Sequence, residues 1–332
     1  MINIAEIEHN PDWVPHGLNL NTKTVEFLRI PSAQLALPGF LAEFNPEHIE
    51  DRTFIAFDDV LSMAPPRGSL HFIFHTAFCR STLLTRALNI PSVSDGLNEP
   101  GIFAALTNAG EDAGPLIRPI LRLLARPRGS QHVVFVKPTN HSNRLIPTLL
   151  KAAPNAKAIL ITNDVPYFLE SVQRRGLLGR NWVRKLYLEL QAYAGIDFQM
   201  DARETYLLTD MQSGALAWLL NQNFFHLVAS SALGNRIRVV DGEWFNKHRA
   251  ETLEAILEFV GIALSQEDAL QAANGPAFAT HSKLGGEYAD KSLSVTREKG
   301  PTQSEEIQQV QRWLKEIEAQ LPIIAPVRQS LA

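Results

Sequence analysis

The 332-residue sequence contains a single cysteine, Cys79, so it can form no disulfide within the chain and no multi-cysteine zinc cluster. Such cysteine usage is typical of a reducing compartment. The first residues lack the basic and apolar segments of a signal peptide. The apolar runs, such as 133–136, are much shorter than the roughly 18 residues of a membrane helix. We therefore expect a cytoplasmic protein with no membrane insertion.

The sequence also lacks a large excess of charge of either sign. It has 31 Lys and Arg against 35 Asp and Glu, which gives a net charge of −4. This balance provides no global positive field for nucleic acid, so a nucleic-acid partner is not expected. With 45% hydrophobic and 20% charged residues the composition is that of a folded globular chain. Any anion-binding site must therefore be local.

Two parts of the chain differ in their pattern. Residues 1–66 hold short strand-like runs broken by prolines and are predicted to form an N-terminal extension. Residues 67–332 alternate short apolar runs with helical segments, which predicts an α/β domain around a mainly parallel sheet. The expected buried strands are 70–74, 132–136, 158–162 and 237–240.

The segment 71–88 carries the clearest functional pattern. A buried strand leads into a short turn with Cys79, Arg80, Ser81 and Thr82, and then into an amphipathic helix. This order directs backbone N–H groups and the positive end of a helix at a bound anion, which predicts a phosphate site. An ordinary strand-turn-helix connection with a Ser/Thr cap is equally compatible. The Gly-x-x-x-x-Gly-Lys-[Ser/Thr] pattern of ATP-binding loops is absent, because both glycines and the lysine are missing.

The turn resembles the phosphosulfate loop of the sulfotransferase family, Pro-[Arg/Lys]-Ser-Gly-Thr-Thr-[Leu/Trp]-Leu. Residues 81–84 align with Thr-Thr-Leu-Leu, Arg80 aligns with the glycine, and Phe78 stands where the family has its basic residue. A second segment, 156–175, is similar to the family's strand and helix in which an arginine and a serine eight residues later bind a 3′-phosphate. Asn163 and Ser171 have that spacing. A third match, over 236–245 and 256–262, is mainly structural.

The resemblance implies a three-layer P-loop NTPase-like fold and a sulfotransferase activity. The donor would be 3′-phosphoadenosine-5′-phosphosulfate (PAPS), the acceptor a hydroxyl or amine of a small molecule or glycan, and no metal would be required. The implied catalytic residues are Arg80, Lys137, and either His141 or Glu99 as the base. The implied cofactor-binding residues are Cys79, Arg80, Ser81, Thr82, Asn163, Ser171, Arg175, Arg297 and Lys299.

Two other functions stay open. Asp241 follows an apolar strand and fits the magnesium ligand of an ATP-dependent small-molecule kinase that would also use Arg80 and Ser81. The missing loop glycine, together with asparagine at position 163, also fits a sulfotransferase-like protein that is not catalytic. The sequence does not identify the acceptor, because loops and lids determine acceptor specificity.

Overall fold

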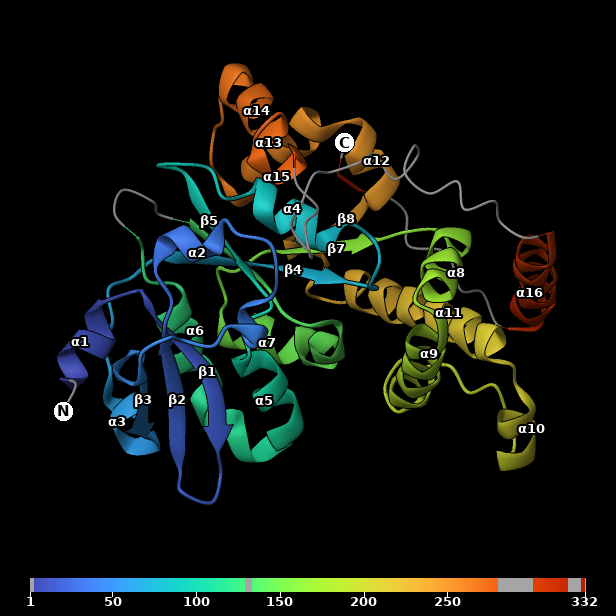
Figure 1. Cartoon of the computed structure of the whole chain (residues 1–332), viewed down its shortest axis with the longest axis horizontal. Coiled ribbons are helices and arrows are strands. Elements are labelled where there is room, and N and C mark those ends of the chain that lie inside the picture. The colour runs from blue at the N-terminus through green and yellow to red at the C-terminus, as the bar shows by residue number, and fades with distance from the viewer. Residues whose placement is uncertain (1–2, 129–132, 280–300, 322–329, 332) are drawn as a thin grey trace.

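The computed structural model describes residues 3–128, 133–279, 301–321 and 330–331 (Figure 1). A five-stranded parallel sheet lies at its centre, with the strand order β5-β6-β4-β7-β8. Its strands are β4 (Ser69–His75), β5 (Ser94–Asn98), β6 (Val133–Lys137), β7 (Ala158–Thr162) and β8 (Ile237–Asp241). Four of the five coincide with the predicted buried strands, and the predicted α/β fold class is confirmed.

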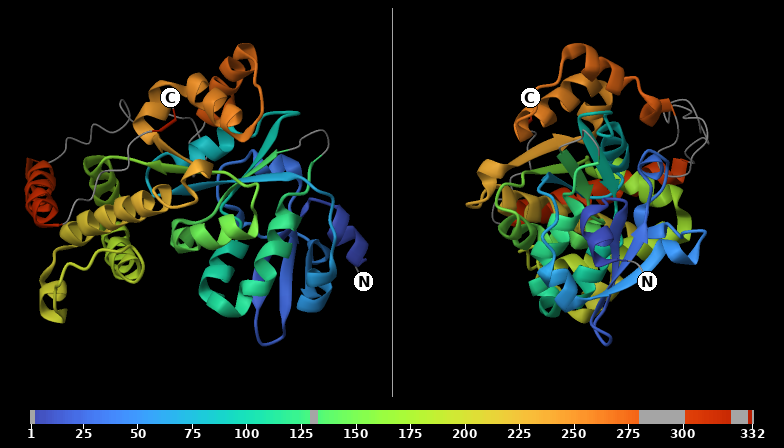
Figure 2. Two further views of the ribbon diagram at one scale, coloured as in Figure 1. Left: turned by 180° about the vertical axis from the view of Figure 1, so that it is seen from behind. Right: turned by 90° about the vertical axis from the view of Figure 1, so that its left-hand side faces the viewer.

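Helices cover both faces of the sheet (Figures 1 and 2). Successive side chains of each strand point to opposite faces, so Phe72 and Phe74 of β4 join one buried hydrophobic cluster and Ile73 joins the other. The face with Ile73 is covered by α4 (Ser81–Ala87), α12 (Gly242–Lys247), α13 (Arg249–Val260), α14 (Gln266–Ala273) and α15 (Pro276–Ala279). These helices and those on the opposite face make the three layers.

The opposite face has two groups of helices. The first group is α5 (Ile102–Ala109), α6 (Gly114–Leu124), α7 (Ile146–Ala152) and the long buried α11 (Asp210–Ala229). A second group packs around α11 and consists of α8 (Val165–Arg174), α9 (Gly176–Gln191) and α16 (Pro301–Gln320), and the short α10 (Ala202–Leu207) lies beyond them. No helix in the described part of the chain is long and apolar enough to cross a membrane.

Strand β5 is not among the predicted strands. Its sequence, Ser-Asp-Gly-Leu-Asn, has one large apolar side chain, yet all five residues are buried. A Cβ atom at Gly96 would lie 2.0 Å from the carbonyl oxygen of Thr85 in α4, so the glycine lets that helix pack directly on the strand. Close packing, not an apolar run, therefore buries β5, and hydrophobic periodicity alone does not reveal it.

The N-terminal region forms a three-stranded antiparallel sheet of β1 (Trp13–Asn19), β2 (Thr24–Arg29) and β3 (Arg52–Ala56). Its helices are α1 (Ile4–His9), α2 (Ser32–Leu35) and α3 (Phe57–Ser62). Trp13 and Phe27 lie in the same buried cluster as Phe72 of the central sheet. The buried Arg126 guanidinium also donates to the carbonyl oxygens of Ile7 and Trp13. The N-terminal sheet thus shares a core with the rest of the chain, and the boundary at residue 66 stays a prediction.

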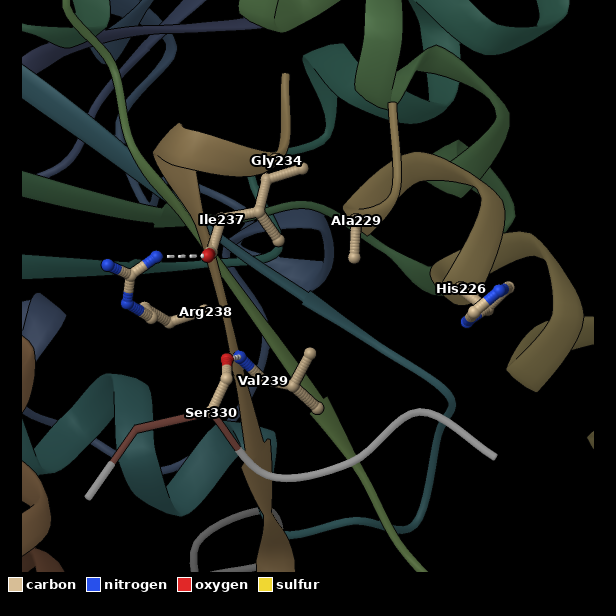
Figure 3. A pocket seen from close by; sticks show the side chains of 7 residues that line it. All are labelled: His226, Ala229, Gly234, Ile237, Arg238, Val239 and Ser330. Carbon is tan, nitrogen blue, oxygen red and sulfur yellow. Dashed lines mark hydrogen bonds between the residues drawn. The ribbon is translucent and has the colours of Figure 1, made fainter. Parts of the chain in front are cut away.

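The outer edge of β8 is covered by residues near the end of the chain (Figure 3). The backbone N–H of Ser330 donates to the Val239 carbonyl oxygen (3.1 Å), and the Ser330 hydroxyl accepts from the Val239 N–H (2.9 Å). A pocket beside this contact is lined by Ala229, Gly234 and Arg238, among others. The pocket flanks the amino-terminal half of β8 and is therefore separate from the carboxyl ends of the strands.

Candidate active site

The turn between β4 and α4 has an unusual backbone. Ala77, Phe78 and Arg80 all have positive φ, at 69°, 55° and 68°. This left-handed region is unfavourable for residues with a Cβ and costs about 1–3 kcal/mol each. Such residues persist only where the surroundings hold them, and successive N–H groups in mixed conformations can form a concave anion site. The turn therefore adopts a backbone conformation that favours glycine at three positions, none of which is glycine.

Packing on both sides of the turn holds this conformation. The Phe78 ring packs against Phe168 and Trp182, with centroids 5.7 and 5.3 Å away. The Cys79 thiol is buried and donates to the Ile161 carbonyl oxygen at 3.3 Å. Burial raises the pKa of this thiol. The Cys79 side chain thus points into the core, and only its backbone faces the turn.

Arg80 occupies the position that aligns with the family's glycine. It is the N-cap residue of α4, and its side chain does not cap the helix. The N–H groups of the first turn, which includes the predicted residues Ser81 and Thr82, have no acceptor within the helix. The sequence therefore places an arginine, in a glycine-like conformation, directly before the amides that the pattern predicts to bind an anion.

The Arg80 guanidinium forms an ion pair across the site. Its Nε and Nη2 donate to Oε1 of Glu243 in α12, at 3.1 and 2.7 Å. Helix α12 packs closely on the turn, because a Cβ at Gly242 would lie 2.4 Å from the Cys79 carbonyl oxygen. Arg80 is thus a paired cation, and any bound anion must compete with Glu243.

Asp241, the residue of the kinase alternative, caps α12. Its Oδ1 accepts from the N–H groups of Glu243 and Trp244, at 2.9 and 2.8 Å. Burial, and then the charges of Asp241 and Glu243, raise the pKa of Asp164, the N-cap residue of α8. Within the described residues, no group of three or more His, Cys, Asp or Glu side chains is arranged to hold a metal ion. This side of the turn is acidic. The Asp241 carboxylate caps α12, the Glu243 carboxylate pairs with Arg80, and the Asp164 side chain makes no capping hydrogen bond.

On the other side of the turn, three strands bring a second ion pair together. Lys137 is the last residue of β6, its side chain is fully buried, and its Nζ donates to Oε1 of Glu99. Glu99 directly follows β5, and its backbone N–H donates to the Lys137 carbonyl oxygen at 2.7 Å. His75 ends β4, with Nε2 3.4 Å from the Lys137 Nζ and 3.8 Å from Glu99 Oε1. The carboxyl ends of parallel strands meet at one edge, so residues far apart in sequence converge there.

Burial changes the properties of this lysine. Desolvation lowers the pKa of Lys137, and the charge of Glu99 opposes that shift. The ring of Phe40 lies 5.5 Å from the ammonium, within the range of a cation–π contact. The site thus holds an ammonium group in dry surroundings, where its interaction with a negative charge is strong.

His141, the other predicted base, lies in a different environment. It belongs to the 3₁₀ turn Asn140–Leu145, whose N-cap is Thr139. Its Nδ1 pairs with Oε2 of Glu189 in α9, and this hydrogen bond raises the pKa of His141. The structure therefore brings Glu99 to Lys137 and holds His141 against α9.

The residues predicted to bind a 3′-phosphate gather around β7 and α8. The buried Asn163 amide donates to the Phe78 carbonyl oxygen at 3.4 Å. The Ser171 hydroxyl accepts from Nη2 of Arg174 at 2.8 Å, and the Arg175 guanidinium lies 5.0 Å from the Phe78 ring centroid. Two arginines, Arg174 and Arg175, thus lie beside the position predicted for the 3′-phosphate. The other two predicted residues, Arg297 and Lys299, lie outside the described residues.

Three charged or titratable side chains of the site were not among the predicted residues: His75, Glu189 and Glu243. His75 is at the end of a predicted strand, and that position is the only sequence signal for it. Glu243 follows β8 by two residues, and Glu189 lies in the last turn of α9. Neither of these glutamates stands in a pattern that indicates its partner.

No family model and no curated protein matches the sequence. Among solved structures, the chain is similar to the sulfotransferase domain from the curacin biosynthetic pathway, at 15% identity and a TM-score of 0.40, over 79% of this chain and 100% of that one. Retinol dehydratase in complex with androsterone and inactive cofactor PAP is similar at 13% identity and a TM-score of 0.38, covering 79% and 84%. The sulfotransferase from Alicyclobacillus acidocaldarius is similar at 15% identity and a TM-score of 0.36, covering 64% and 94%.

Proposed function

We propose that this protein is a sulfotransferase-like enzyme that transfers a sulfuryl group from PAPS to a hydroxyl or amine of a small-molecule or glycan acceptor. One observation carries the proposal. The buried Lys137–Glu99 pair lies at the edge of the sheet where β4 enters its phosphate-loop-like turn. A cation and a carboxylate at this edge are the two groups that sulfuryl transfer needs, because the leaving phosphate gains charge while the acceptor loses a proton.

The residues present fit the two ends of the donor. The turn of Ala77 to Arg80 and the first residues of α4, Ser81 and Thr82, would hold the 5′-phosphosulfate through the amides of the helix and the Arg80 guanidinium. Asn163, Ser171 and Arg175 would face the 3′-phosphate, with Arg297 and Lys299 as further predicted contacts. Bound there, PAPS supplies an activated sulfuryl group whose transfer requires no metal.

In this proposal Lys137 and Glu99 act as a coupled pair. Glu99 accepts the proton of the attacking hydroxyl or amine and so loses its negative charge. The Lys137 ammonium then loses its counterion and is available to the negative charge that develops on the leaving group. The fully buried position of Lys137 strengthens this interaction. His141 is the second candidate base, and its pairing with Glu189 makes it the weaker candidate.

Isothermal titration calorimetry with 3′,5′-adenosine bisphosphate (PAP) tests the donor assignment on the full chain. We expect binding without Mg²⁺, and weaker binding of adenosine 5′-monophosphate, which lacks the 3′-phosphate. Absence of PAP binding at millimolar concentration would refute the donor assignment. Binding of ATP that requires Mg²⁺ and is indifferent to a 3′-phosphate would favour the kinase alternative.

A second experiment tests the base. With ³⁵S-labelled PAPS and a panel of phenols, amines and sugars, Glu99→Gln should abolish label transfer while PAP binding remains. His141→Asn should retain most of the transfer. The opposite result would move the role of the base to His141. PAP binding with no transfer to any acceptor would support the non-catalytic alternative.

A further inference from the structure

The two ring nitrogens of His75 contact two different parts of the site. Nδ1 accepts a hydrogen bond from the backbone N–H of Ala77, at 3.2 Å, within the turn that follows β4. Nε2 lies 3.2 Å from the carbonyl oxygen of Pro138, the residue that follows β6. The ring is buried, and its own carbonyl oxygen accepts from the Asn143 amide at 3.0 Å. His75 therefore connects the start of the turn to the end of the strand that carries Lys137.

These contacts determine where the ring proton lies. A backbone N–H is always a donor, so Nδ1 must present its lone pair to Ala77 and cannot carry a proton. A carbonyl oxygen is always an acceptor, so Nε2 must carry the proton and donate it to Pro138. The ring is then the neutral Nε2–H tautomer.

The tautomer has a consequence for Lys137. Its Nζ is 3.4 Å from Nε2, but a protonated Nε2 has no lone pair to offer the ammonium. The remaining partner on this side is Glu99, to which the ammonium does donate. His75 thus offers Lys137 no acceptor, and the ammonium of Lys137 stays directed at the Glu99 carboxylate.

We propose that His75 is a positioning residue that, as the neutral Nε2–H tautomer, holds the anion-binding turn in register with the Lys137–Glu99 pair. The roles of the turn and of the Lys137–Glu99 pair rest on the proposed function. The contacts of the His75 ring do not depend on it. Two substitutions separate the contacts. His75→Asn keeps an acceptor near the Nδ1 position, and His75→Gln keeps a donor near the Nε2 position.

The first test reads the tautomer directly in the wild-type full chain. With ¹⁵N-labelled histidine, long-range ¹H–¹⁵N correlation spectra at neutral pH should show an unprotonated Nδ1 and a protonated Nε2 for His75. The signals are assigned by their loss in His75→Gln. A protonated Nδ1, alone or together with Nε2, would overturn the proposal. This measurement needs no ligand, and the only variant it needs is the one used for assignment. If His75→Gln does not fold, His75→Asn can be used for assignment instead.

The second test compares the two variants at the turn. Losing one backbone hydrogen bond should speed amide exchange of Ala77 about 3- to 10-fold in His75→Gln and leave it nearly unchanged in His75→Asn. PAP affinity should fall by a similar factor in the glutamine variant only. The matched control is His71→Gln, which removes another buried histidine of β4 whose contacts are to Ser69 and Lys157. Equal effects of Asn and Gln at position 75 would overturn the proposal. If wild type fails to bind PAP, the proposed function fails, while the tautomer and the Ala77 exchange still decide the role of His75.

Discussion

The two sides of the β4–α4 turn each hold an ion pair, and the two pairs differ in burial. The Lys137–Glu99 pair lies toward β6 and β5, with side chains 0% and 18% exposed. The Arg80–Glu243 pair lies toward β7 and β8, with side chains 20% and 24% exposed. Breaking a buried pair is costly because it leaves an unpaired charge out of water. Opening a partly exposed pair costs little, because water replaces the partner.

This difference suggests a division of labour. A bound phosphate can replace Glu243 at Arg80 with little loss, so Arg80 is suited to binding. Lys137 cannot exchange its partner so easily, because loss of Glu99 would leave its buried charge unpaired. Under the proposed function, the partly exposed pair therefore fits recognition of the donor, and the buried pair fits the reaction.

The largest effect is expected at the buried pair. Lys137→Met leaves the Glu99 carboxylate without a counterion and should reduce the free energy of unfolding by about 3–5 kcal/mol, measured by urea denaturation. Adding Glu99→Gln should restore part of this loss, because the unpaired charge is gone. Lys151→Met, at an exposed position of α7, is the control. A Lys137 variant as stable as this control would show that the pair is not a buried one.

At the exposed pair, Arg80→Ala should mainly affect binding. Removal of charge-assisted hydrogen bonds to a phosphate should weaken PAP binding about 10- to 100-fold by calorimetry. Arg203→Ala, on the exposed surface of α10, should leave it unchanged. Arg80→Gly separates charge from backbone, because glycine adopts the positive φ freely. Arg80→Gly should weaken PAP binding as much as Arg80→Ala does. Its free energy of unfolding should nevertheless be higher than that of the alanine variant by about 1 kcal/mol. Equal stability of the two variants would contradict the left-handed backbone at this position.

Glu243→Gln should act in the opposite direction. It releases Arg80 from its counterion, so PAP affinity should rise, by at most about fivefold given the small energy of partly exposed pairs. Thermal stability should change by less than about 1 kcal/mol. Glu251→Gln, on the exposed face of α13, is the control for the change in net charge. A fall in affinity would mean that Glu243 orients Arg80 toward the ligand and does not compete with it.

The smallest effect is expected at His141. Its pKa in the folded state lies above the ordinary value of 6.5 because of Glu189. The pair therefore stabilises the fold fully below pH 6.5 and loses that contribution as the pH rises through the raised pKa. His141→Asn should be less stable than wild type by under about 1 kcal/mol at pH 5.5, and the gap should narrow at pH 9. Glu189→Gln should lower the pKa of His141 in an NMR titration. A pH-independent gap would indicate that the pair is not formed in solution.

The sequence predicts those parts of the molecule that depend on local patterns. Residues 158–161 are a continuous apolar run, and together with Thr162 they form a strand buried on both faces, as expected of a parallel sheet. The helix before Gly261 ends there because that residue has a positive φ of 95°, which glycine adopts without strain. Turn composition likewise predicts a turn at Arg80 between β4 and α4, although Ser81 and Thr82 already belong to the helix.

The partners of the charged residues were decided by the tertiary structure alone. Glu99 contacts Lys137 because β5 and β6 are neighbouring strands. No local sequence pattern indicates that strand order. Arg80 meets Glu243 because Gly242 allows α12 to approach the turn, across more than 160 residues of chain. Local hydrophobic and turn preferences act over a few residues and so can be read from the sequence. Which carboxylate neutralises which cation depends on how the elements pack, and that packing assigned Glu99 to Lys137, Glu189 to His141 and Glu243 to Arg80.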